Sequence, residues 1–381
     1  MVEVQDIFRL HEQEYRSMFN PSYVQCKAIS SISKCRTADL GSHTDICGGC
    51  GNVRISYNSC RNRHCPKCQT LSKERWIDGQ KHNLLNVGYF HAVFTVPDDL
   101  RPIFYQNQKE MYNLLFKAVS ETLHELAANK KYLGASTNIG FTSILHTWGK
   151  NLMYHPHIHC IIPAGGIDAL GRWVHSRKKF FIPIKVLSRK FRGKLLDFIK
   201  SAKLTFFGEH HLNNPKLFNK LLTTCYSKEW VVYCKPPFKT VATVIEYLGR
   251  YTHRVAISNN RIIKAENGTV SFKWRDYKDG NKWKVMTVTG IEFMRRFLMH
   301  ILPAGFMKIR HYGFLGNSNR AKILLCKKLT NTPIMPMVKT PTLELICKLL
   351  GRDVNVCTVC GFRNEPIRHE PTQYLHPPKT G

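Results

Sequence analysis

The stretch Tyr154–Gly166, YHPHIHCIIPAGG, sets His157 and His159 two residues apart in an apolar run that is typical of a β-strand. Because alternate side chains of a strand point to the same face, the two imidazoles lie side by side while Ile158 is directed into the core. Such a pair on a rigid strand can bind one metal ion, since imidazole is the commonest metal ligand in proteins. The pattern alone is weak, and a complete metal site needs a third ligand.

The preceding segment IGFTSILHTW, residues 139–148, is also typical of a strand, and a short turn separates it from the histidines. We therefore predict a hairpin in which the two strands are antiparallel neighbours. This pairing would bring His146 beside His157, which makes His146 the favoured third ligand. Two alternatives stay open at this point, namely His91 in a predicted strand at residues 89–96, and Glu246.

Downstream, the segment VATVIEYLGRYTHR, residues 241–254, predicts a helix over about residues 240–252. Tyr247 and Tyr251 lie four residues apart, so both phenols share one helix face. A phenol with a pKa of about 10 is a poor nucleophile, and a nearby cation lowers that pKa and neutralises charge on a phosphate under attack. Paired histidines and paired tyrosines together suggest metal-assisted cleavage of a phosphodiester by tyrosine.

Attack by a tyrosine would leave a 5′-phosphotyrosine and a free 3′-hydroxyl, and the covalent link would keep the phosphodiester energy for later rejoining. Two tyrosines on one face would permit a second cleavage while the first strand end is held, as strand transfer requires. Arg250 and Arg254 lie beside the tyrosines and suit phosphate positioning. The alternative is that Tyr247 and Tyr251 form an aromatic pair in the core.

The N-terminal part is rich in cysteine, and CGGC (residues 47–50) and CPKC (residues 65–68) are two C-x2-C pairs with 14 residues between them. Each pair forms a tight knuckle, and two knuckles complete a tetrahedral zinc site. We therefore predict one structural zinc bound by Cys47, Cys50, Cys65 and Cys68. The candidates for a second zinc, or alternatively for small residues of a compact core, are Cys26, Cys35, His43, Cys60 and His64.

Basic residues stand beside the predicted zinc ligands, namely Arg61, Arg63 and Lys67. A zinc loop that presents them is suited to contact DNA, and the alternative is that they only keep this region soluble. A third C-x2-C pair, Cys357 and Cys360, lies near the C-terminus, where unpaired thiols in a frayed tail are the alternative to metal binding. Its candidate partners are Cys326 and Cys347.

The order of patterns predicts an α+β fold with an antiparallel sheet, helices packed on it and a small zinc-binding domain in front. We place a turn-rich zinc-binding head at residues 1–75, a catalytic domain at 76–265 and a C-terminal part at 266–381. A strand at 230–234 is expected to stop before Pro236. The other predicted elements are helices at 100–130, 185–205 and 290–302, strands at 254–258, 261–265, 269–275 and 284–288, and an irregular tail from about residue 326.

The charge balance indicates the partner. Lys and Arg number 57 against 26 Asp and Glu in 381 residues, a formal charge of +31, and the commonest large polyanions in a cell are nucleic acids. A ribosomal or RNA-binding protein is the simplest alternative. The start of the chain lacks the features of a signal peptide, and no apolar run approaches the roughly 20 residues that span a bilayer. We expect a cytoplasmic protein with no membrane partner, in which 14 cysteines indicate metal binding more than disulfides.

Taken together, these motifs resemble the rolling-circle transposases of the insertion sequence 91 family. His157-Ile158-His159 is similar to their histidine–hydrophobic–histidine (HUH) motif, and Tyr247 and Tyr251 are similar to their paired tyrosines. The resemblance extends over nearly the whole chain. It includes VFTVP (residues 93–97), the cysteine-rich head, YLGRYTHRVAISNNRI (residues 247–262) and GFMKIRHYGFLGNSNR (residues 305–320).

The resemblance implies an HUH-type sheet and a divalent cation, usually magnesium or manganese. It also implies single-stranded DNA as substrate, at the ends of a mobile element and at its target, in a bacterial enzyme that acts at the nucleoid. A replication initiator of a plasmid or phage, which uses the same chemistry, is the alternative function. A zinc-dependent nucleic-acid-binding protein without catalysis is the second alternative. The oligomeric state and the tyrosine that attacks first stay open.

Overall fold

The computed structural model describes residues 2–134, 136–176, 181–238, 243, 244, 249, 255–276, 279–334, 336 and 338–364. The chain forms two compact units, each discontinuous in sequence. The first, which we call the sheet unit, combines Met1–Ser33 with Arg61–Lys339, and the second, the hairpin unit, combines Lys34–Cys60 with Thr340–Gly381. The domain boundaries predicted near residues 75 and 265 stay a prediction beside this division into two units.

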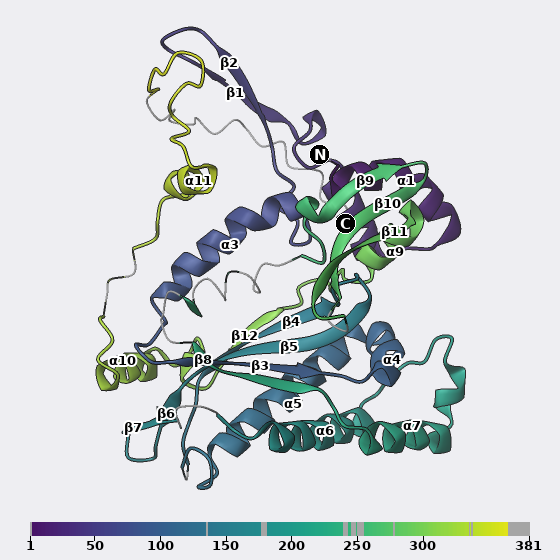
Figure 1. Cartoon of the computed structure of the whole chain (residues 1–381), viewed down its shortest axis with the longest axis vertical. Coiled ribbons are helices and arrows are strands. Elements are labelled where there is room, and N and C mark those ends of the chain that lie inside the picture. Colours follow the sequence, from purple (N-terminus) through teal and green to yellow (C-terminus); the bar gives the residue numbers. More distant parts are fainter. Residues whose placement is uncertain are drawn as a thin grey trace, which may run out of the picture. The chain divides into compact units, whose positions relative to one another are not determined.

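A five-stranded antiparallel sheet forms the centre of the sheet unit (Figure 1). Its strand order is β12-β4-β5-β3-β8, and every neighbouring pair runs antiparallel. The strands are Tyr89–Thr95 (β3), Phe141–Trp148 (β4), Tyr154–Pro163 (β5), Val232–Phe238 (β8) and Ile309–Tyr312 (β12). This sheet and its packed helices confirm the predicted α+β class, and β4 and β5 form the predicted hairpin.

The two faces of the sheet are covered by different elements. Helices α5 (Gln108–Ala127) and α6 (Ile184–Ser201) pack on one face, and α3 (Pro66–Lys81) lies on the other side (Figure 1). Toward α5 and α6 the strands present apolar side chains such as Phe94 and Ile158, which are completely buried in the main core. Burial of each such side chain stabilises the fold by roughly 1.5–3 kcal/mol. Because side chains alternate along a strand, the histidines on either side of Ile158 point to the opposite face.

A second sheet follows later in the chain, with strand order β11-β10-β9. Its strands are Ile262–Glu266 (β9), Thr269–Asp276 (β10) and Lys282–Thr289 (β11), and helix α9 (Gly290–Leu298) packs on it through Phe272 and Phe293. The strand predicted at 254–258 is wrong for its described part, since residues 255–258 are not in a strand and Asn259–Arg261 forms a short 3-10 helix (η4). Ala256 and Ile257 are both buried, so this apolar run packs without alternating as a strand does.

Several helices lie where turns or an irregular tail were predicted. They are α1 (Val4–Met18), α2 (Tyr23–Ser33), α10 (Arg320–Leu329) and α11 (Thr342–Leu350), and α7 (Pro215–Ser227) fills a segment without a prediction. In α1 the missed signal is the helical spacing of Val4, Ile7 and Phe8, which are completely buried. Phe8 packs edge-on against Phe297 of α9, with ring centroids 5.2 Å apart, which is why the N-terminus belongs to the sheet unit. None of the described helices is long and apolar enough to cross a bilayer.

The remaining elements of the sheet unit are short. The helix predicted at 100–130 divides at Asn107 into α4 (Arg101–Gln106) and α5. Strand β8 continues past Pro236, where we expected it to stop, because β8 is an edge strand and a residue without an N–H need not break the ladder there. The other elements are β6 (Gly165–Ile167), β7 (Trp173–His175), η2 (Asp98–Leu100), η3 (His210–Asn213) and η5 (Gly313–Leu315).

The hairpin unit has a small sheet and very little apolar core. Strands β1 (Ser42–Ile46) and β2 (Val53–Tyr57) pair antiparallel, preceded by η1 (Ala38–Leu40), and α11 comes from the C-terminal part. Among the described residues of this unit, Leu345 has the one apolar side chain, apart from those of cysteines, that is buried.

Candidate metal centres

Three histidines converge on the face of the five-stranded sheet that α5 and α6 do not cover. His146 comes from β4, His157 and His159 come from β5, and one ring nitrogen of each lies within 4.8 Å of the others. The hairpin register explains this, because His146 is the direct cross-strand partner of His157. We call these three residues the histidine cluster. The structure thus places the favoured third ligand beside the predicted pair.

Hydrogen bonds orient the rings of the histidine cluster. The Nδ1–H of His157 donates to the backbone carbonyl of His155 at 2.6 Å, which leaves the lone pair on Nε2. Nδ1 of His159 lies 2.8 Å from Nε2 of His91 on β3, and burial lowers the pKa of His91 to about 3, so His91 is neutral. Histidines that bind metals typically have such a partner on the second ring nitrogen. His91, an alternative third ligand, therefore contacts the cluster from outside it.

The surroundings of the cluster are largely apolar. His146 is 2% exposed and His159 is 7% exposed, while the third member is half-buried. Trp148 stacks on His146 with ring centroids 4.7 Å apart, and Ile144 and Ile161 lie beside the histidines on the same face. Neutral imidazoles cost little to bury here, and a low local polarity strengthens any interaction that they make with a charge.

His155 connects the cluster with α4. Its Nδ1 lies 2.7 Å from Nη2 of Arg101, which also pairs with Asp98. Burial, with the Arg101 charge as the second cause, lowers the pKa of His155 to about 4, so the neutral ring accepts from the guanidinium. This bond holds the residue whose carbonyl orients His157. Sequence reasoning missed Arg101, because no local pattern links two residues that lie 54 positions apart.

Five predicted site residues lie outside the described residues, namely Tyr247, Tyr251, Glu246, Arg250 and Arg254. The structure describes three other residues of the same segment, and Thr243, Val244 and Gly249 are helical. Val244 is completely buried together with Ile144 and Ile161. Val244 therefore lies on the face of the sheet that carries the histidines.

The cysteines group differently from the prediction. The structure brings together Cys47, Cys50, Cys357 and Cys360, whose sulfur atoms all lie within 4.8 Å of one another. We call these four residues the cysteine cluster, and all of them belong to the hairpin unit. This corrects the predicted site, since Cys65 and Cys68 belong to the sheet unit, where Cys65 is the N-cap of α3. The chain contains three C-x2-C pairs, and spacing along the sequence does not decide which pairs meet in space.

The other predicted zinc candidates have different surroundings. Cys326 is buried with Leu85 and Phe314, and Cys347 on α11 lies near Asp353, so neither completes the C-terminal pair. In the predicted head, the Cys60 N–H donates to Sγ of Cys35 at 3.5 Å. The remaining three are Cys26, which accepts from Arg16, His64, which accepts from the Leu302 N–H, and His43 on β1.

The basic residues predicted to contact DNA beside the cysteines differ in the contacts and the exposure of their side chains. Nη1 of Arg63 donates to the Phe306 carbonyl at 2.7 Å, and burial lowers the pKa of this guanidinium. Lys67 pairs with Glu3, just before α1. Arg61 is exposed. Arg63 and Lys67 thus hold the start of α3 within the sheet unit, and of these three Arg61 is the one with an exposed side chain.

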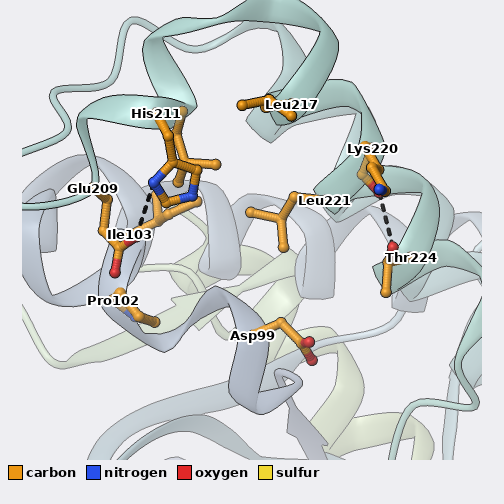
Figure 2. Close-up of a pocket in the computed structure, with 10 residues that line it drawn as sticks. Asp99, Pro102, Ile103, Glu209, His211, Leu217, Lys220, Leu221 and Thr224 are labelled. Atoms are coloured by element: carbon orange, nitrogen blue, oxygen red, sulfur yellow. Dashed lines mark hydrogen bonds and ion pairs between the residues drawn. The ribbon is translucent and has the colours of Figure 1, made fainter.

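A cavity of about 300 Å³ lies between η2 and α4 on one side and η3 and α7 on the other (Figure 2). It is lined by apolar side chains that include Ile103 and Leu221, by Asp99, and by the pair Glu209 and His211, whose Oε2 and Nδ1 atoms are 3.5 Å apart (Figure 2). No residue of the histidine cluster lines it. The candidate chemistry therefore belongs to the histidine cluster on the sheet.

Fold and site together define a class of protein. A cluster of oriented histidines on an antiparallel sheet suits one divalent ion, and a four-cysteine cluster suits zinc. With a formal charge of +31, the chain is a metal-binding α+β protein suited to nucleic acid.

Comparisons with known proteins narrow this class. Residues 140–322 match the family described as "Putative transposase", and residues 7–96 match the "Transposase zinc-binding domain". The "Putative transposase y4qJ" of Sinorhizobium fredii (strain NBRC 101917 / NGR234) is 45% identical over 370 residues, 94% of this chain and 92% of that protein. The "Transposase for insertion sequence element IS801" of Pseudomonas savastanoi pv. phaseolicola is 27% identical over 352 residues, 89% of this chain and 82% of that protein. No solved structure matches the chain.

The chain belongs to the insertion sequence 91 family of transposases. This confirms the family inferred from the motifs, and with it a role in DNA transposition. The zinc-binding domain and the cysteine cluster together support a structural zinc.

Proposed function

We propose that this transposase nicks and rejoins single-stranded DNA at the ends of its element through 5′-phosphotyrosine intermediates, in a rolling-circle mechanism. The observation that carries the proposal is the histidine cluster, in which the bond from His157 to the His155 carbonyl leaves the ring's lone pair on Nε2. Three imidazoles on a rigid sheet are suited to metal-assisted cleavage of a phosphodiester. We place this reaction in a bacterial cytoplasm, at the nucleoid.

The donor set of the cluster fits a divalent cation. His146, His157 and His159 would hold it, and His91 and His155 would keep two of the rings in their orientation. When bound, the ion would act as a Lewis acid on the scissile phosphate and lower the pKa of the attacking phenol. Imidazole nitrogen is a softer donor than the oxygen atoms that Mg²⁺ prefers, so we expect Mn²⁺ to support more activity than Mg²⁺.

Tyr247 and Tyr251 are the proposed nucleophiles, and the position of Val244 supports this. The two tyrosines follow Val244 by three and seven residues, and such positions share one helix face. Val244 packs against Ile144 and Ile161, each two residues away from a member of the histidine cluster. A helix that continues from Val244 would therefore carry both phenols over the histidine face.

In the proposed step the phenol oxygen bonds to phosphorus while the bond between phosphorus and O3′ breaks. The phenol proton is transferred, in balance, to the leaving 3′-hydroxyl. Attack of a 3′-hydroxyl on the phosphotyrosine reverses the step and rejoins the strand without ATP. The second tyrosine would cleave again while the first still holds an end, and Arg250 and Arg254 would position the phosphates.

Cys65 and Cys68 stay predicted zinc ligands, with partners other than Cys47 and Cys50. Cys35 and Cys60 stay candidates for a second zinc, as the sequence offers them. The bond from the Cys60 N–H to Sγ of Cys35 shows that these two residues lie together within the hairpin unit.

A nicking assay with a labelled single-stranded oligonucleotide, read on a denaturing gel, tests the metal site. His157→Ala should abolish nicking and leave DNA binding mostly intact, because affinity comes chiefly from phosphate contacts of Lys and Arg. His175→Ala is the matched control, since His175 is exposed on β7, and it should nick like wild type. Nicking by His157→Ala at the wild-type rate would overturn the metal assignment.

Phenylalanine substitutions test the nucleophiles, because they remove only the hydroxyl. The Tyr247→Phe, Tyr251→Phe double variant should form no covalent DNA adduct. Each single variant should still cleave, yet fail at strand transfer, which needs two attacks. An adduct in the double variant, or wild-type transposition by a single variant, would refute the two-nucleophile mechanism.

A further inference from the structure

The cysteine cluster is built from two matching backbone turns. In residues 47–52, the Cys47 N–H donates to the Asn52 carbonyl and the Gly51 N–H donates to the Cys47 carbonyl, both at 2.9 Å. Residues 357–362 repeat the two bonds between corresponding positions, at 2.9 and 3.0 Å. Gly51 and Gly361 have φ of 70° and 74°, a conformation that glycine adopts without strain. Each C-x2-C-G segment is therefore a knuckle that presents two thiols.

The two knuckles face each other within the hairpin unit. Sγ of Cys47 lies 3.6 Å from Sγ of Cys360, and Sγ of Cys50 lies 3.8 Å from Sγ of Cys357. These separations are far longer than a disulfide bond of about 2.05 Å. A tetrahedron with zinc–sulfur bonds of about 2.3 Å has edges of about 3.8 Å, so the spacing fits a zinc ion at the centre.

Contacts beside the sulfur atoms hold the knuckles against each other. The Gly48 N–H donates to Oδ1 of Asn364 at 3.0 Å. A Cβ added to Gly49 would lie 2.7 Å from the ring of Phe362, closer than such atoms approach. The two glycines of CGGC thus allow the C-terminal knuckle to pack closely on the N-terminal one.

The hairpin unit has little else to stabilise it. Ile46 and Val53, at the end of the hairpin next to the first knuckle, are 63% and 56% exposed, and Leu345 supplies the buried aliphatic side chain among the described residues. Small units without a sufficient core usually depend on a metal or on disulfides.

We propose that Cys47, Cys50, Cys357 and Cys360 bind one zinc ion that joins the N-terminal hairpin and the C-terminal segment into a single module. The facing pairs are 313 and 307 residues apart in the chain. The matched zinc-binding family domain ends at residue 96, so half of the ligand set lies outside it. It follows that the fold of the β1–β2 hairpin depends on the C-terminal segment from Thr340 onward.

Elemental analysis of the full-length protein and its serine variants tests this proposal. Replacing Cys357 and Cys360 should lower the zinc content by one per chain, and replacing Cys47 and Cys50 should do the same. The variant with all four replacements should lose no more than one zinc, because the pairs share it. Cys347→Ser, in the same unit but outside the cluster, is the matched control and should retain all zinc. Full zinc in the Cys357 and Cys360 variant, or a loss of two in the fourfold variant, would overturn the proposal.

Two further variants separate ligand loss from misfolding. Cys360→His retains a side chain that binds zinc, so it should bind the zinc that Cys360→Ser loses. With one thiolate ligand fewer, its cobalt-substituted form should show weaker thiolate-to-metal charge transfer than cobalt-substituted wild type. Gly49→Ala keeps all four thiols but crowds Phe362, so a chelator should remove its zinc several-fold faster. The proposal fails if Cys360→His binds no more zinc than Cys360→Ser, or if Gly49→Ala releases zinc at the wild-type rate.

Discussion

The sheet unit and the hairpin unit are stabilised in different ways. In the sheet unit, side chains such as Phe94 and Phe191 are completely buried between the sheet and α6, with ring centroids 5.1 Å apart. In the hairpin unit, apolar side chains such as Ile55 are exposed, and the cysteine cluster takes the place of a core. We therefore expect the histidine cluster to rest on a platform that folds without a bound ion, and the proposed zinc to be part of the fold of the hairpin unit.

The largest expected effect is the unfolding that follows the removal of zinc. A strong chelator should unfold the hairpin unit and leave the five-stranded sheet folded, because the sheet has a large apolar core and the described residues of the hairpin unit have very little. Limited proteolysis with mass spectrometry should then find new cleavage within residues 34–60 and 340–364 and continued protection of β4 and β5. Cleavage of both units at the same time would contradict the expectation that the hairpin unit depends on zinc for its fold and the sheet unit does not.

The same contrast explains which features were predictable from sequence. The hairpin of β4 and β5 is local, and its alternation of apolar and polar side chains fixes which residues face each other. His146 opposite His157 therefore followed from the pattern, and so did the direction of Ile158 into the core. The support from His91 did not follow, because the pairing of β3 with β5 depends on the whole sheet.

The cysteine cluster could not be predicted in this way. Its two knuckles are separated by roughly the length of the sheet unit, and chain spacing favoured the nearer CPKC pair. One local signal does distinguish the pairs: a glycine with positive φ follows Cys50 and Cys360, whereas Gln69 follows Cys68 within α3. The residue after each pair was thus more informative than the spacing between pairs.

The second prediction compares core truncation in the two units. Phe94→Ala should lower the free energy of unfolding of the sheet unit by about 3–5 kcal/mol, because it leaves a cavity in a dense core. Ile55→Ala, at a side chain that is 55% exposed, should change stability by no more than about 0.5 kcal/mol. Denaturant titration measures both. A comparable loss in Ile55→Ala would mean that the hairpin has an apolar core.

The third prediction concerns acid. His300 is buried, Nε2 donates to the Leu152 carbonyl at 3.0 Å, and burial lowers the pKa of His300 from 6.5 to about 4. As the pH falls through 6.5 the unfolded chain takes up a proton that the folded state refuses until about pH 4. The stabilisation is thus complete above pH 6.5 and is lost between 6.5 and 4, by about 3 kcal/mol.

His300→Gln keeps a hydrogen-bond donor and does not titrate, so its stability should depend less on pH within this window. Denaturant unfolding at pH 7, 5.5 and 4.5 provides the comparison, with wild type as the reference. Identical slopes for the two proteins would remove His300 from the acid response of the sheet unit.

The smallest expected effect concerns the hydrogen bond between His91 and His159. It tests whether the orientation of His159 depends on this bond or on the sheet backbone alone. His91→Phe keeps the aromatic ring that stacks on His159, with centroids 5.1 Å apart, but removes the bond between the two rings. Because all three members of the histidine cluster remain, the site should still bind Mn²⁺, with an affinity lowered by about 10–100-fold. Mn²⁺ titration followed by nicking activity measures this, and His146→Ala, which removes a proposed ligand, should lose more. If His91→Phe binds Mn²⁺ as tightly as wild type, the sheet backbone alone orients His159. The hydrogen bond from His91 on β3 would then contribute only to the packing of the sheet.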